Sequence, residues 1–203
     1  MWLDGLYMLE PFYAEYSVVN NQPEYFNDII NQFVWMEKYG RDAKTGLLYH
    51  GWDESKLQRW ANKKTGLSPE FWSRSIGWYM MALVDVLDFI PANHPRRNEL
   101  IKILNRTTTA LIKFQDAKSG VWWQVTNKAN LDKNYLESSG TAMFVFSIAK
   151  AIRMKYLPAT FNAALQKAYN GMIKEFVKED ASGQYHYMQA VAGAGLGGIP
   201  YRD

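Results

Sequence analysis

The sequence predicts an all-α protein whose helices form two concentric layers, and three observations support that fold class. Helical segments alternate between segments that are apolar on every side and segments with a single apolar stripe, which indicates buried inner helices and half-exposed outer helices. A turn that begins Asp-Ala and ends in Gly recurs from residues 42, 116 and 180. One inner helix, one outer helix and one turn therefore form a repeated unit, as is typical of an α/α toroid.

The inner helices are expected over residues 4–18, 74–90 and 138–154. Pro11 lies inside the first of them and should kink it or end it early. Ser138 and Ser139 supply hydroxyls that suit the N-cap of the third. The outer helices are expected over residues 23–39, 98–115 and 159–179, and after each turn an aromatic segment indicates a short strand. The pattern thus accounts for about three helical hairpins, with short strands in the long loops.

A closed α/α toroid contains six helical hairpins, so three would leave the inner helices open on both sides. We therefore expect residues 1–203 to form a single domain that is the C-terminal portion of a longer toroid. The connectors from outer to inner helices, near residues 40–73 and 116–137, are long, whereas those near 19–22, 91–97 and 155–158 are short. One rim is therefore elaborated, and such a rim is where function concentrates.

Composition excludes several classes of function. The net charge of +3 comes from interspersed charges without a basic run, so no nucleic-acid partner is expected. No apolar run is long enough to span a bilayer, so no membrane partner is expected. The absence of cysteine excludes disulfides and thiolate chemistry and fits a cytoplasmic protein. No cluster has metal-ligand spacing, so neither a metal nor a cofactor is expected.

The elaborated rim also carries the N-termini of the inner helices, which favour anions. Asp4, His50, Trp72 and Arg74 fall on it. Indole rings stack on sugars and a guanidinium pairs with a carboxylate, so this set suits an anionic sugar. The alternatives are ordinary: Asp4 as an N-cap, His50 as a structural hydrogen-bonding residue, and Trp72 with Arg74 as packing and surface charge.

Other polar motifs carry less weight. Asp53 and Glu54 are adjacent acids on a loop, interpreted as a solvated pair because two-carboxylate glycoside hydrolysis needs carboxyl groups on either side of a sugar. The Gly-rich residues 193–198 match a dinucleotide motif by letter but lack the surrounding βαβ unit, and they are interpreted as a loop. His94 is assigned to the surface, while His186, in the third turn-strand, stays open as a site residue.

Four segments carry a resemblance to a known family: WLDGLYM at 2–8, YHGWDE at 49–54, GLSPEFWSRSIGW at 66–78 and GLGGIPYRD at 195–203. In these segments, and from end to end, the sequence resembles the unsaturated rhamnogalacturonyl hydrolases, which are bacterial six-hairpin toroids. The related unsaturated glucuronyl hydrolases share the fold and the aspartate but fewer of these segments.

The resemblance implies an unusual glycosidase whose partner is an unsaturated oligosaccharide. An aspartate hydrates the enol-ether double bond of a terminal 4,5-unsaturated galacturonate, without attack on the anomeric carbon, and rhamnose is released. By position Asp4 matches that aspartate, and His50, Trp72, Arg74 and Trp78 match residues that line the sugar site. Arg74 would bind the uronate carboxylate or a hydroxyl. Glucuronyl specificity toward glycosaminoglycan fragments stays open as an alternative.

An inactive sugar-binding fragment is the other alternative. The first hairpins of the family contribute further cleft residues, including another acidic residue and a histidine, which this sequence lacks.

Overall fold

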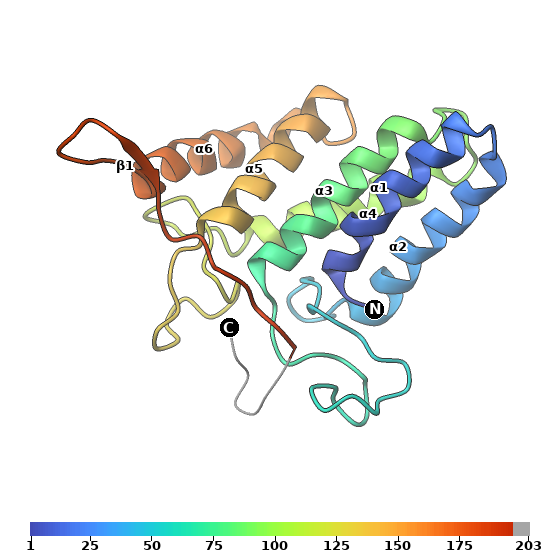
Figure 1. The fold of residues 1–203 in the computed structure, drawn as a ribbon, viewed down its shortest axis with the longest axis horizontal. Coiled ribbons are helices and arrows are strands. Elements are labelled where there is room, and N and C mark those ends of the chain that lie inside the picture. Colours follow the sequence, from blue (N-terminus) through green and yellow to red (C-terminus); the bar gives the residue numbers. More distant parts are fainter. Residues whose placement is uncertain (197–203) are drawn as a thin grey trace.

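The computed structural model describes residues 1–196 as two layers of helices (Figure 1). Its inner helices are α1 (Leu3–Val19), α3 (Ser73–Phe89) and α5 (Ser138–Arg153), and its outer helices are α2 (Phe26–Gly40), α4 (Arg97–Ile112) and α6 (Asn162–Phe176). α3 packs between α1 and α5, and each inner helix packs against the outer helix that follows it. The expected three hairpins of an α/α toroid are therefore present.

The helix boundaries differ from expectation at a few ends. α1 continues through Pro11 to Val19, so Pro11 does not end it. The outer helices α2 and α6 are each preceded by a short 3-10 helix, at Pro23–Tyr25 and Ala159–Phe161. The sixth helix ends at Phe176 and not at residue 179, because the next residues form β1 (Val177–Glu179), which pairs antiparallel with β2 (Tyr185–Tyr187) across the third turn.

Each repeated turn is closed by its own aspartate. Asp116 accepts hydrogen bonds from the backbone amide and the hydroxyl of Ser119, both at 2.7 Å, and Gly120 adopts φ +82°. The turns that begin at residues 42 and 180 have the same design, with glycines at φ +77° and +81°. Positive φ is the conformation that glycine adopts at little cost, which explains the terminal Gly of the motif.

A fourth copy of the turn lies inside the long loop and was missed in the sequence. Asn62 takes the place of the aspartate, accepting bonds from the amides of Lys64 and Thr65, and Gly66 has φ +80°. The Asp-Ala start is absent there, so the repeat did not reveal it. A Cβ at Gly66 would lie 2.2 Å from the Asp53 carbonyl oxygen, so only glycine fits.

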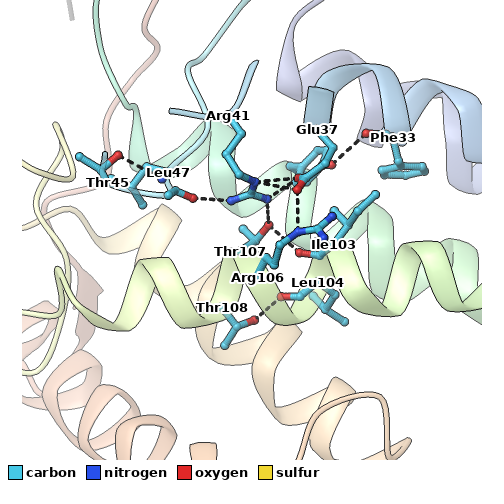
Figure 2. Close-up of polar contacts among 12 residues, drawn as sticks. Phe33, Glu37, Arg41, Thr45, Leu47, Ile103, Leu104, Arg106, Thr107 and Thr108 are labelled. Carbon is cyan, nitrogen blue, oxygen red and sulfur yellow. Dashed lines mark hydrogen bonds and ion pairs between the residues drawn. The ribbon is translucent and has the colours of Figure 1, made fainter. Parts of the chain in front are cut away.

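Arg41 ties the first turn to the outer layer (Figure 2). Its Nε donates to Glu37 of α2 at 2.8 Å, its Nη2 donates to Thr107 of α4 at 2.8 Å, and its Nη1 donates to the carbonyl of Gly46 in the turn. Arg106 also pairs with Glu37 at 2.7 Å. This network fixes the base of the segment that carries His50 to both α2 and α4.

The N-terminus of each inner helix is held by a segment from the next long loop. In all three units the backbone amide of the first helical residue donates to a carbonyl there: Leu3 to His50 (3.0 Å), Ser73 to Gln124 (3.0 Å) and Ser138 to Gln189 (3.1 Å). These amides have no partner inside their own helices, so the loops complete them. The same contact places three equivalent loop residues beside the three helix starts.

Burial of the inner helices is uneven. α3 has neighbours on both sides and is buried along most of its length. By contrast, large apolar side chains of α1 are exposed, including Met8, Leu9, Phe12 and Tyr16. The expectation that α1 is buried all round is therefore wrong within residues 1–196, because α1 has an inner-helix neighbour on one side only.

Candidate functional site

Four of the five predicted site residues gather where α1 and α3 begin. Asp4 and Arg74 occupy the same position in the repeat, the second residue of an inner helix, and Ser139 is their counterpart in α5. His50 and Trp72 lie beside them, with ring centroids 4.9 Å apart. Residues separated by up to 70 positions in the sequence therefore form one cluster on the elaborated rim.

Asp4 and His50 face each other at the start of α1. Asp4 Oδ2 lies 3.1 Å from His50 Nε2, and the Asp4 side chain keeps 22% of its surface exposed while the His50 side chain is fully buried. The N-cap position of α1 belongs to Trp2, which makes no side-chain capping bond, so Asp4 is not the N-cap. Asp4 is thus a carboxyl group in the first turn of a helix, with one side open to a ligand.

The Trp72 side chain is mainly a packing group. It is only 4% exposed, its Nε1 donates to Gln124 Oε1 at 3.2 Å, and the Arg74 Cζ lies 5.6 Å from its ring centroid. The His50 ring lies between this indole and that of Trp2, whose centroid is 5.4 Å away. Trp72 therefore holds His50 and Arg74 in place, which matches the packing alternative more closely than free stacking on a sugar.

Arg74 is fixed along one edge of its guanidinium. Nε donates to Ser139 Oγ at 2.7 Å, Nη2 donates to the carbonyl of Val191, and Nη2 lies 3.9 Å from Glu137 Oε1. Within residues 1–196, Arg74 Nη1 donates no hydrogen bond. Arg74 is thus a preorganised donor, and the edge formed by Nε and Nη2 is already occupied.

Trp78 lies one helical turn after Arg74, and its ring packs against Tyr7 with centroids 4.6 Å apart. Tyr7 in turn lies three residues after Asp4, so the aromatic pair shares the inner faces that carry the acid and the cation. Both side chains are half-buried. This pair, more than Trp72, offers aromatic surface for a sugar ring.

The sequence did not indicate Glu137, Gln124 or Val191, and it suggested Ser139 only as an N-cap residue. Glu137, not the expected Ser138 or Ser139 hydroxyl, caps α5, accepting from the backbone amides of Ser139 and Gly140. The available signal was the repeat itself: residues 137–139 stand in the same register at the start of α5 as residues 72–74 at the start of α3.

The remaining candidates lie outside this cluster. Asp53 caps its own loop through the hydroxyl of Ser55, and Glu54 is exposed, so the solvated-pair interpretation fits. The exposed His186 contacts Asp180 at 2.7 Å within the hairpin, and this bond lowers the pKa of Asp180. His94 is half-buried, and burial lowers its pKa.

Within residues 1–196, no group of three histidine or acidic side chains is placed to hold a metal ion, and no helix is long and apolar enough to cross a bilayer. Residues 197–203, which include part of the Gly-rich motif and most of the segment GLGGIPYRD, lie outside the described residues.

Comparison with known proteins relates the chain to carbohydrate-active enzymes. The family model described as Glycosyl Hydrolase Family 88 matches residues 1–202. The 24.9 kDa protein in the picA locus of Rhizobium radiobacter is 36% identical over 200 residues, which cover 95% of this chain and 84% of that protein. The unsaturated rhamnogalacturonyl hydrolase YesR of Bacillus subtilis is 29% identical over 166 residues, 81% of this chain and 45% of that protein.

A solved glycoside hydrolase of family 105 from C. acetobutylicum ATCC 824 superposes with a TM-score of 0.95 at 48% identity, over 100% of this chain and 56% of that chain. This chain therefore spans about half the length of YesR and of the C. acetobutylicum enzyme. The predicted α/α toroid fold is confirmed, and so is the predicted family resemblance. With a family match along nearly its whole length, the chain belongs to glycosyl hydrolase family 88.

Proposed function

We propose that this chain acts on oligosaccharides ending in 4,5-unsaturated galacturonate, such as those from rhamnogalacturonan, by hydrating the double bond. The observation that carries this proposal is the carboxyl group of Asp4 on the open rim, 3.1 Å from the buried His50 ring. The matched family supports glycosidase chemistry, and the name of the B. subtilis relative supports the choice of substrate.

One carboxyl group suffices for this reaction. Asp4 donates its proton to C4 of the enol ether, and the positive charge that develops at C5 draws in a water molecule. The Asp4 carboxylate then accepts a proton from that water, which restores the acid and leaves a hemiketal at C5. Opening of the hemiketal breaks the C5–O5 bond and gives a ketone at C5 and a hemiacetal at C1. Collapse of that hemiacetal to an aldehyde breaks the C1–O bond, and the neighbouring sugar leaves as an alcohol. His50 orients Asp4, Arg74 Nη1 donates to the uronate carboxylate or a hydroxyl, and Trp78 with Tyr7 contacts the sugar ring.

The test follows the ultraviolet absorbance of the unsaturated uronate. Loss of a general acid/base typically costs about 10²- to 10⁴-fold in rate, so Asp4→Asn should lose at least about 10²-fold. Glu54→Gln, an exposed acid on the nearby loop, should keep wild-type activity. Pectin-derived and glycosaminoglycan-derived disaccharides, compared in the same assay, decide between galacturonate and glucuronate. A folded wild-type chain that leaves the absorbance of both substrates unchanged refutes the assignment.

A second candidate is sugar binding without turnover, favoured by the Arg74 guanidinium that Ser139 and Val191 already hold in place. It predicts heat release on titration with an unsaturated disaccharide, equal for the wild type and Asp4→Asn, with no loss of absorbance.

A further inference from the structure

Glu137 occupies an unexpected place for a buried acid. The residue just before α1 is Trp2 and the residue just before α3 is Trp72, but before α5 it is Glu137. Glu137 is fully buried. Glutamate is not among the side chains favoured at an N-cap, where shorter Ser, Thr, Asp and Asn reach the helix amides more readily. Capping alone therefore does not explain why a glutamate stands here.

Its two carboxylate oxygens have different surroundings. Oε2 accepts from the amide of Gly140 at 2.7 Å, which is a capping bond. Oε1 accepts from the amide of Ser139 at 2.9 Å, from the Ser139 hydroxyl at 2.6 Å and from the amide of Val191 at 3.1 Å. Oε1 also lies 3.9 Å from Arg74 Nη2. One oxygen thus joins α5, the start of α3 and a segment near the end of the chain.

Val191 belongs to residues 188–196, which we call the strap. The strap crosses the rim next to the cluster. The Gln189 carbonyl accepts a hydrogen bond from the first backbone amide of α5, and the Val191 carbonyl accepts one from Arg74. At its far end, Leu196 is buried, and a Cβ on Gly51 would lie 2.5 Å from Leu196 Cδ1. The strap therefore extends from the start of α5 to the residue that follows His50.

The start of α5 also packs closely on the start of α3. A Cβ on Gly140 would lie 2.9 Å from the Arg74 backbone nitrogen, so glycine permits this approach. The close contact brings Ser139 and Glu137 within reach of the Arg74 guanidinium. A buried carboxylate beside a partly buried guanidinium needs that positive charge, since an unpaired buried charge is costly.

From these contacts we propose that Glu137 is a positioning residue for Arg74, which it holds together with Ser139 and the strap so that Nη1 meets the substrate. The proposal rests on the proposed function, because it assigns how the sugar-binding arginine is held. Removal of the Glu137 charge should release the strap and let Arg74 rotate. Substrate binding should then weaken, while proton transfer by Asp4 should change little.

Glu137→Gln keeps the shape but removes the charge and one acceptor oxygen. Loss of a hydrogen bond to a charged group corresponds to roughly 10- to 100-fold, so KM should rise at least about tenfold while kcat changes less than about threefold. Ser139→Ala, which removes the Nε partner without leaving a buried charge unpaired, should move KM in the same direction. In an Arg74→Ala background, Glu137→Gln should have no further effect on KM. The matched control is Glu99→Gln, an ion-paired acid on the outer helix α4.

A second measurement does not depend on activity. The chain has no cysteine, so Val191→Cys introduces a single thiol at a buried strap position. Glu137→Gln should accelerate its labelling by a thiol reagent at least about tenfold, and Glu99→Gln should not. Unchanged labelling overturns the proposal whether or not the wild type is active. Faster labelling with an unchanged KM also overturns it, because Glu137 would then be a structural cap alone. An inactive wild type refutes the proposed function separately.

Discussion

The most direct physical test of the fold concerns Glu10, an acid buried in α1. The side chain is 2% exposed, and its Oε2 has no hydrogen-bond partner among the described residues. Burial, with a smaller contribution from the nearby Asp28 carboxylate, raises the pKa of Glu10 from 4.5 to about 8. The folded protein therefore keeps this proton over a range of pH in which the unfolded chain releases it.

The direction of the pH dependence of stability follows from the number of protons that the folded and unfolded states bind. Below a pH of about 4.5 both states are protonated, and Glu10 imposes no pH-dependent cost. Between 4.5 and about 8 the unfolded chain ionises first, so the free energy of unfolding falls by about 1.4 kcal/mol per pH unit. Above about pH 8 the loss of unfolding free energy is complete. The difference between the pKa values of the unfolded and folded states limits this loss to about 5 kcal/mol.

Glu10→Gln replaces the acid with a neutral amide of the same shape. Its free energy of unfolding, relative to wild type, should rise by several kcal/mol between about pH 5 and about pH 9 in urea titrations. Glu15→Gln, on the exposed side of the same helix, is the matched control and should show no such change. If the difference in the free energy of unfolding between the wild type and Glu10→Gln stays constant with pH, Glu10 is not buried as described.

Three other substitutions test packing and turn chemistry. Gly77→Ala places a Cβ 2.8 Å from the Met143 side chain between α3 and α5 and should cost about 1–3 kcal/mol in thermal unfolding. The Cβ of Gly5→Ala would meet no atom within 4 Å, so this variant should be neutral or more stable by up to about 1 kcal/mol. An equal loss of stability in Gly77→Ala and Gly5→Ala would contradict the α3–α5 contact. Asp116→Ala should cost about 1–2 kcal/mol near neutral pH. Burial opposes ionisation of Asp116, but the hydrogen bonds from Ser119 outweigh burial and lower the pKa of Asp116. The extra stability of the wild type over Asp116→Ala should therefore disappear as the pH falls through the lowered pKa.

The layered fold was predictable because its signals are local. Apolar periodicity along the chain separates inner from outer helices, and the Asp and Gly of the repeated turn encode their own geometry through a side-chain cap and a positive φ. One error has a local cause and the other a tertiary one. Val177 extends the α6 segment in sequence, but the hairpin closed by Asp180 draws it into β1. The asymmetric burial of α1 depends on which neighbours it has, which periodicity does not record.

The candidate site was predictable only in part. Asp4, Arg74 and His50 stand in recognisable segments, but the contacts that fix them come from far along the chain. Val191 is 117 residues from Arg74, and no local pattern links the two. Glu137 precedes two serines that are better N-cap residues by propensity, so the serines drew the prediction. Glu137 is nevertheless the N-cap of α5, where tertiary contacts place its buried carboxylate near the distant guanidinium of Arg74.

The repeat explains how one scaffold assembles this chemistry. The second residue of the inner helices is an acid in α1, a cation in α3 and a hydroxyl in α5, namely Asp4, Arg74 and Ser139. Each stands where the helix backbone is held by the next loop, so its position is set by contacts common to all three units. A substitution at such a position changes the chemistry of the rim without changing the backbone that supports it. The rim therefore presents an acid, a cation and a hydroxyl side by side because neighbouring units differ at equivalent positions, while Glu137 links two of those units.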